Sequence, residues 1–130
     1  NYLSVNNLAG ITGSQVSTNG DIILIAESDS AIFAVSAGLA GSGKLAFASS
    51  VSVNFIRNDI QSFIKNSTVS SSNSNTEVTD GHYPGVTVYA ANTSNIFSIA
   101  GQVNFSGKEG IGAAAAYNDI SNTIQANWGC

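Results

Sequence analysis

The stretch that decides the fold is IFAVSAG, residues 32–38, because a matching stretch, IFSIAGQ, recurs at residues 96–102. The offset of 64 residues continues without a gap to the end of the chain, so that SGK at 42–44 meets SGK at 106–108. Self-similarity over a fixed long period is typical of repeat architectures. We therefore predict two copies of one unit, residues 1–66 and residues 67–130.

The repeat also decides between helix and strand. The run GAAAAY at 112–117 has the alanine content of a helix, yet its counterpart ASSVSV at 48–53 alternates small polar and β-branched residues with period 2. Because two copies of one unit share a conformation, strand is the better prediction. Similar runs, separated by Gly, Asn, Ser or Asp, predict strands of about five to seven residues and no long helix; they are Ile22 to Ala26, Ile32 to Ala37, Ile60 to Ile64, Val86 to Ala90 and Ile96 to Val103.

A long gapless repeat with few charges and many Asn and Ser residues favours one continuous parallel β-helix, or β-solenoid, over a sandwich or barrel. Coils of about 20 residues would give three coils per copy and six in the chain. Inward positions are then expected to be buried in both copies. They include Ile32 with Ile96, Ile56 with Ile120, and Ile60 with Ile124.

Asparagine has a specific use in such a fold. At turns its side chain tolerates left-handed backbone geometry, bonds to neighbouring backbone, and stacks into ladders. The candidates for turn or ladder positions are Asn54 with Asn118 and Asn58 with Asn122, which match at the repeat offset. The polar run at 67–76 is expected to be a loop and not a flexible linker.

Composition excludes several classes of function. Charged residues make up 9% of the 130 residues and Lys plus Arg total 4, too few for binding a nucleic acid backbone. No apolar run approaches the roughly 20 residues of a membrane helix, so we expect a soluble chain without membrane insertion. The opening NYLSVNN lacks a secretory signal, so we expect the chain to begin in mature sequence. With His82 and Cys130 as the only residues of their kinds, no zinc site or other cofactor is predicted.

Three motifs that suggest chemistry have simpler interpretations. GLAGSGK at 38–44 matches a phosphate-binding loop up to its lysine, but Leu45 stands where Ser or Thr should hold magnesium, so a turn is predicted. His82 near Asp80 could act as a base, but no nucleophile is evident and its counterpart at the repeat offset is Thr18, so a surface turn is predicted.

Acidic residues could form the carboxylate pairs of a glycosidase, as Glu27 with Asp29 or Asp59 with Asp119. The other copy does not repeat these acids, and single acids on a surface with few charges are normally solvated. We predict no catalytic residue.

The order of these segments resembles the repeats of very large bacterial surface adhesins, both filamentous-haemagglutinin-like and leukotoxin-type. The resemblance is carried by GSGK at 41–44, SVSVNFIRN at 50–58, QSFI at 61–64 and VTVYA at 86–90, and it covers about 20–66 and 84–130. It implies a long β-helix that is secreted or held at the outer cell surface.

The expected function is therefore that of a structural and adhesive segment, a rigid β-helical spacer in a virulence-related adhesin. Its expected partners are neighbouring repeats of the same long chain and host-cell glycans or proteins. End-to-end self-association is also expected, since a cut solenoid exposes an unpaired edge beside Trp128 and Cys130. The alternatives are a carbohydrate-active β-helix enzyme fragment and a phage tail-fibre segment.

Overall fold

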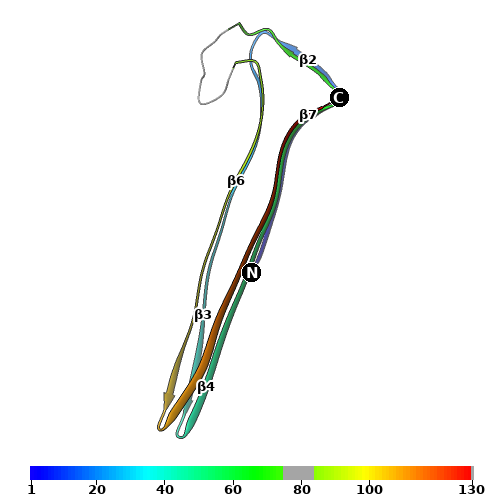
Figure 1. Ribbon diagram of the computed structural model, residues 1–130. Helices are drawn as coiled ribbons and strands as arrows, with labels where there is room; N and C mark the ends of the chain where they lie inside the picture. Colours follow the sequence, from blue (N-terminus) through cyan, green and yellow to red (C-terminus); the bar gives the residue numbers. More distant parts are fainter. Residues whose placement is uncertain (75–83, 130) are drawn as a thin grey trace. The chain divides into compact units, whose positions relative to one another are not determined.

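The computed structural model describes residues 1–74 and 84–129, and within them the chain contains strands and no helix. The all-β prediction is confirmed, and the alanine run at 112–117 lies in a strand. The predicted turn at Asp80 and His82 lies outside the described residues. The strands, shown in Figure 1, are β1 (Tyr2–Thr12), β2 (Gln15–Thr18), β3 (Ile22–Ser42), β4 (Leu45–Lys65), β5 (Thr68–Ser71), β6 (Val86–Ser106) and β7 (Glu109–Gly129).

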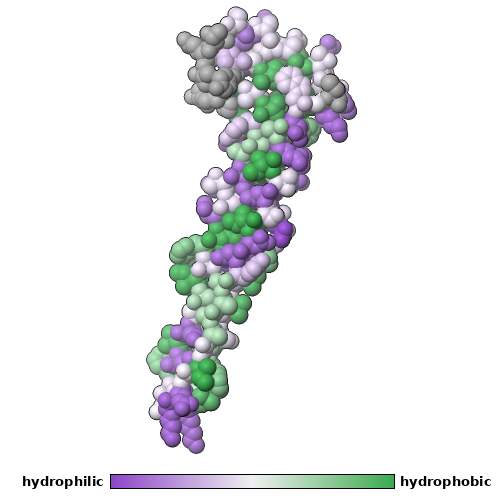
Figure 2. Space-filling view, in the orientation of Figure 1, coloured by the Kyte–Doolittle hydropathy of each residue, from purple (hydrophilic) through white to green (hydrophobic). Residues whose placement is uncertain are grey.

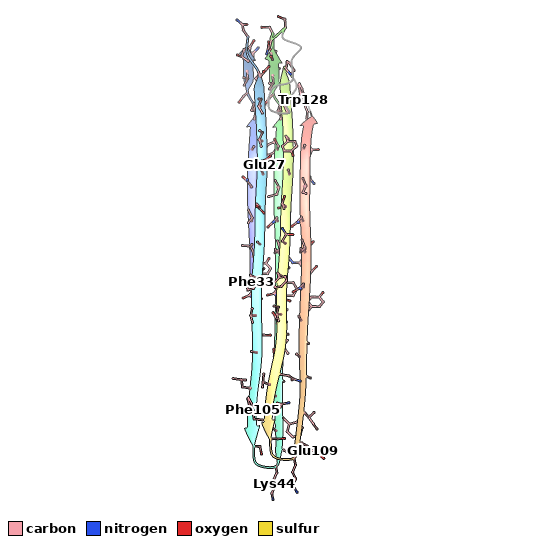
Figure 3. All side chains as sticks on the ribbon, turned by 90° about the vertical axis from the view of Figure 1, so that its left-hand side faces the viewer. Glu27, Phe33, Lys44, Phe105, Glu109 and Trp128 are labelled. Atoms are coloured by element: carbon pink, nitrogen blue, oxygen red, sulfur yellow. The ribbon has the colours of Figure 1, made fainter. Side chains whose placement is uncertain are left out.

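Strands far apart in the sequence pair with one another, in the orders β1-β4-β7, β2-β5 and β3-β6. At one end of the β3–β6 sheet, the Ile22 N–H donates to the Gly85 carbonyl at 2.8 Å. At the other end, the Gly107 N–H donates to the Ser42 carbonyl at 3.3 Å. Because the offset is near 64 residues at both ends, β3 and β6 run parallel. Figure 3 shows the long strands side by side. The fold is thus all-β with parallel sheets.

The repeat offset differs upstream of residue 20, where the sequence prediction is wrong. β2 pairs with β5 in parallel, Gln15 opposite Thr68 and Thr18 opposite Ser71, an offset of 53 residues. Thr18 is therefore not the counterpart of His82. The connection between β5 and β6 is eleven residues longer than the connection between β2 and β3, which accounts for the change of offset from 53 to 64 residues. An insertion at that place disturbs neither strand. The polar run at 67–76, expected to be a loop, contains β5.

The strands are also longer than the sequence indicated. Each of the four longest has 21 residues, because small residues such as Ser30 and Gly38 continue the alternation between and beyond the shorter strands that were expected. Neighbouring strands in a sheet are consequently 53 or 64 residues apart. The expected coil of about 20 residues, with three coils per copy, is wrong.

After β3 the chain turns at Gly43 and Lys44, and β4 returns in a different sheet. This confirms the turn predicted in place of a phosphate loop; Lys44 and Glu109 mark the two stacked turns in Figure 3. β3 and β4 face each other through even-numbered side chains. For example, the Ser36 and Ser50 Oγ atoms are 2.7 Å apart.

The chain divides into two compact units, and each contains parts of both repeat copies. Unit 1 comprises Asn1–Ser4, Ser30–Arg57 and Ser94–Ser121, and unit 2 comprises Val5–Asp29, Asn58–Thr93 and Asn122–Cys130. The division of the sequence into copies 1–66 and 67–130 stays a prediction.

Unit 1 has mostly small and polar residues inside, with Ile56 as the large exception, and large apolar residues outside. Its buried residues are Ser30, Ala34, Ala46, Ala48, Ser50, Ser52, Asn54 and Ile56. On its outer faces, by contrast, Phe33 is 71% exposed and Leu39 is 76% exposed.

Unit 2 has the usual arrangement. Leu24, Ile64 and Val69 form an apolar cluster, with Ala26 and Ile60 also buried. Ile11, Val16, Ile22, Val86 and Val88 pack against that cluster, so the apolar core of the molecule lies in this unit.

β7 is the last strand of its sheet, and its inward side chains are exposed. Ile120 is 44% exposed and Ile124 is 48% exposed, whereas their β4 counterparts Ile56 and Ile60 are fully buried. The expected burial of Ile120 and Ile124 is therefore wrong, because burial here requires a strand on both sides and not only an inward position.

Candidate functional site

Asn54 is the centre of a polar ladder inside unit 1. It lies in β4 and is fully buried. The Asn1 side-chain amide donates to Asn54 Oδ1 at 2.7 Å, and Asn54 Nδ2 donates to Asn118 Oδ1 at 2.9 Å and to Ser52 Oγ at 3.1 Å. Both amide protons and the carbonyl of Asn54 thus have partners, as a buried amide requires.

The ladder joins two strands of one sheet, β4 and β7, and the residue that precedes its third strand, β1. Asn1 is in the segment preceding β1, Asn54 is in β4 and Asn118 is in β7, where it also accepts a hydrogen bond from Ser98 Oγ at 3.1 Å. Slipping one strand by two residues would break this chain of amides inside the unit. The ladder therefore fixes the register of stacking.

The other predicted pair is arranged differently. Asn58 lies in β4 of unit 2 and is buried, and its Nδ2 donates across the layers to Asn92 Oδ1 at 3.0 Å. Asn122 occupies an exposed position in β7. Asn54, Asn58, Asn118 and Asn122 all lie in strands and none lies at a turn.

Two of the acidic residues considered as catalytic pairs, Asp119 and Asp59, have other partners. Asp119 forms an ion pair with Arg57, with an N–O distance of 3.0 Å between side chains that are 32% and 49% exposed. The Asp59 carboxylate accepts a hydrogen bond from the Gln61 amide at 2.9 Å. An exposed pair such as Arg57 and Asp119 contributes about 0–1 kcal/mol, and here it joins β4 to β7.

Asp21 holds the connection between β5 and β6. Its Oδ1 accepts hydrogen bonds from the Gly85 N–H at 2.8 Å and from the Asn73 amide at 2.7 Å. These bonds, the first from Gly85, lower the pKa of Asp21 below its ordinary value of 3.8. Gly85 has φ of 110°, a left-handed conformation that favours glycine. The carboxylate thus joins the residues that flank the inserted segment.

Within residues 1–74 and 84–129, no group of three or more His, Cys, Asp and Glu residues is arranged to hold a metal ion. A hollow of about 560 Å³ in unit 2, wide open to solvent, is lined by Thr12, Gln61, Phe63, Ile64, Lys65, Asn127 and Gly129. Lys65 is its one charged residue, and the lining contains no pairing of a base with a nucleophile. The described part of the chain has no helix that could cross a bilayer.

The outer faces of unit 1 are its most unusual surfaces. Phe33 and Phe97 stack on the β3–β6 sheet with ring centroids 5.2 Å apart and planes 8° apart. On the β1-β4-β7 sheet, the ring centroids of Phe55 and Tyr117 are 5.9 Å apart and their planes are tilted by 57°. Figure 2 shows apolar side chains at the surface along the long strands, alternating with polar ones. Such exposed apolar area is typical of contact surfaces.

Sequence reasoning missed these faces although it found the strands that carry them. The signal was present in the odd-numbered positions of IFAVSAGL, where Phe33, Val35 and Leu39 alternate with small residues. Alternation alone does not say which set is buried. The second signal was the smallness of Ser36 and Gly38, since facing layers approach closely only through small side chains.

Comparison with known proteins gives no guide here: the chain matches no family model, no curated protein and no solved structure.

Proposed function

We propose that the chain is a segment of a parallel β-helix, built from two copies of a 64-residue unit, that serves as a structural and adhesive spacer in a large bacterial surface or secreted adhesin. The observation that carries the proposal is the stacking of equivalent residues of the two copies. Phe33 lies on Phe97 and Asn54 bonds to Asn118, both at an offset of 64 residues.

Such stacking can be continued. The contacts between the copies are the same kind that a further copy would make with β6 and β7, so each added repeat contributes a similar nearest-neighbour term. The partner of these edges is then the neighbouring repeat of the same long chain. Aliphatic positions such as Ile120 and Ile124, half-exposed here, would be covered as Ile56 and Ile60 are.

The adhesive part of the proposal rests on the outer faces of unit 1. They carry large uncharged side chains, which suit contact with host-cell proteins or glycans at an outer cell surface. A chain with 9% charged residues has little long-range electrostatic attraction for its partners, so contact area would supply the affinity.

The test varies the number of repeats. Chains with two, four and six copies, joined at the same 64-residue offset, are compared by small-angle X-ray scattering. Stacking predicts that one dimension grows by about 4.8 Å for each added copy, the spacing of paired strands. Independently folded repeats on linkers would instead lengthen the particle by tens of ångströms per copy, and this result would refute the β-helix.

Adhesion is tested separately with beads that carry the six-copy chain, applied to cultured epithelial cells. We expect retention of these beads and not of albumin-coated beads. Treating the cells with protease or with glycosidase distinguishes protein from glycan contacts. Retention equal to that of albumin would leave the chain a structural element and refute the adhesive role.

A further inference from the structure

The outer face of the β3–β6 sheet in unit 1, here called the apolar face, presents an unbroken uncharged surface. Its large side chains are between 47% and 76% exposed. Figure 3 shows Phe33 and Phe105 on the side of this sheet turned to the viewer. Within unit 1, no Asp, Glu, Lys, Arg or His occupies an outward position on β3 or β6; the outward acids of β3, Glu27 and Asp29, belong to unit 2. The main contributors are Phe33, Val35, Leu39, Phe97, Ile99 and Phe105.

These side chains contribute little to the folding of the chain itself. The opposite side of β3 in unit 1 packs on β4 through Ala34, Ser36 and Gly38, and those contacts form whether or not the outer face is covered. Exposed apolar area contributes to stability only when a partner removes it from water. The apolar face is therefore suited to contact with something outside the unit.

The geometry of the aromatic pair favours a second sheet over a sugar as that partner. The Phe33 and Phe97 rings face each other, nearly parallel at 5.2 Å, so their faces are directed along the stacking axis and their edges outward. A saccharide that stacks on an aromatic ring needs an open ring face. An apolar sheet accepts ring edges, because edge contacts and interdigitation are the normal packing of aromatic side chains between sheets.

We propose that the apolar face docks against the same face of a second copy of this chain, so that two sheets pack about 10 Å apart around a two-fold axis. The absence of outward charges lets two identical faces meet without like-charge repulsion, although each chain has a net charge of −4. Small residues between the large ones leave gaps for the partner's side chains; a Cβ at Gly101 would meet no atom within 4 Å.

The area is sufficient for a specific dimer. With aromatic side chains of about 150–250 Å² and aliphatic ones somewhat smaller, the six exposed fractions amount to about 700 Å² per copy, close to the roughly 800 Å² per partner of a standard interface. The outer face of the other sheet is less suited. Arg57, Glu109 and Asp119 stand on it and would have to be desolvated.

The test is sedimentation velocity of the full chain over a wide concentration range, with reductant present so that Cys130 forms no disulfide. We expect reversible dimers. Replacing both Phe33→Thr and Phe97→Thr keeps strand propensity and should weaken dimerisation by about tenfold or more. The matched control, Val51→Thr with Ile111→Thr, removes apolar area from the opposite outer face and should change the dimer dissociation constant less than about twofold.

Circular dichroism checks that both variants keep the wild-type β spectrum, so that a loss of dimer reports on the face and not on folding. Several results would overturn the proposal: wild-type chain that stays monomeric, a control that weakens association as much as the Phe pair does, or dimers that persist in the Phe33 and Phe97 variant. Binding of monomeric wild type to phosphatidylcholine vesicles, with loss of binding in that variant, would assign the face to lipid instead.

Discussion

Unit 1 and unit 2 share the same long strands but place their side chains in opposite ways. In unit 2, the inward residues Leu24, Ile60 and Ile64 are buried while Glu27 and Asp29 are exposed. In unit 1, most inward residues are Ala, Ser, Gly and Asn, with Ile56 as a fully buried exception, and the phenylalanines are outside. The same period-2 pattern therefore supports two kinds of interior.

The difference shows that parallel stacking does not need an apolar interior. Where the layers of unit 1 meet, a Cβ on Gly38 would lie 2.5 Å from the Ser49 carbonyl oxygen, so β3 and β4 are in close contact there. Ser50 Oγ donates to the Ser36 carbonyl at 3.0 Å. Close packing and hydrogen bonds such as this one stabilise the interior of unit 1, whereas removal of aliphatic side chains from water stabilises unit 2.

The largest expected effect is in the aliphatic interior of unit 2. Ile60→Asp places an unpaired carboxylate at a fully buried position and should lower the free energy of unfolding by about 3–5 kcal/mol. The matched control is Ile124→Asp, at the equivalent but 48% exposed position of β7. Urea unfolding followed by circular dichroism measures both. Equal losses would show that an added neighbour already covers β7 in solution.

Close packing in unit 1 predicts the next effect. Gly38→Gln should cost about 3 kcal/mol, because a side chain there meets the β4 backbone. At the equivalent place in the second copy, Gln102 fits against Gly112. Adding Ala48→Gly should therefore recover much of the loss, and a double-mutant cycle gives the coupling. Additive losses would mean that the β3–β4 pair of strands does not pack in the way that β6 and β7 pack. Gly101→Ala, which meets no atom within 4 Å, is the control.

The asparagine ladder predicts a smaller effect. Asn54→Leu keeps the size of the side chain but leaves the Asn1 amide and Asn118 Oδ1 without the bonds they make to Asn54, at a cost of about 2 kcal/mol. Asn118→Leu, at the exposed end of the ladder, should cost less. Thermal and urea unfolding compare the two. A stabilised Asn54→Leu variant would show that unit 1, like unit 2, tolerates an apolar interior at this position.

The smallest expected effect concerns pH and the connection in unit 2. Because the folded pKa of Asp21 is lowered, its contribution to stability is present above the ordinary value of 3.8 and is lost as the pH falls through the folded pKa. Asp21→Asn should therefore reduce the fall in stability on acidification below pH 3.8, while Asp29→Asn serves as a control on the outer face of the same unit. Urea unfolding at a series of pH values measures this; parallel curves for Asp21→Asn and wild type would contradict it.

The sequence predicts those features of the fold that depend on local alternation, and it fails for features that depend on which strand lies beside a residue. Alternation identified the strands and the inward set, and the 64-residue offset correctly placed Phe33 on Phe97 and Asn54 opposite Asn118. Exposure of Ile124 depends on whether another strand covers β7, which no local pattern contains. The change of offset from 64 to 53 residues reflects an insertion that a comparison of two divergent copies did not detect.

The spacing of paired strands has a consequence for how the chain reaches this state. Each pairing between neighbouring strands of a sheet closes a loop of 53 or 64 residues, so almost none of the sheet forms from local contacts. Loop-closure entropy must be overcome before such pairings are rewarded, and topologies of this kind fold slowly. A sheet edge that has already formed reduces that barrier, because its edge strand presents ordered N–H and C=O groups to the next strand of the chain. Folding is then expected to proceed in one direction, at a rate set by the availability of a finished edge.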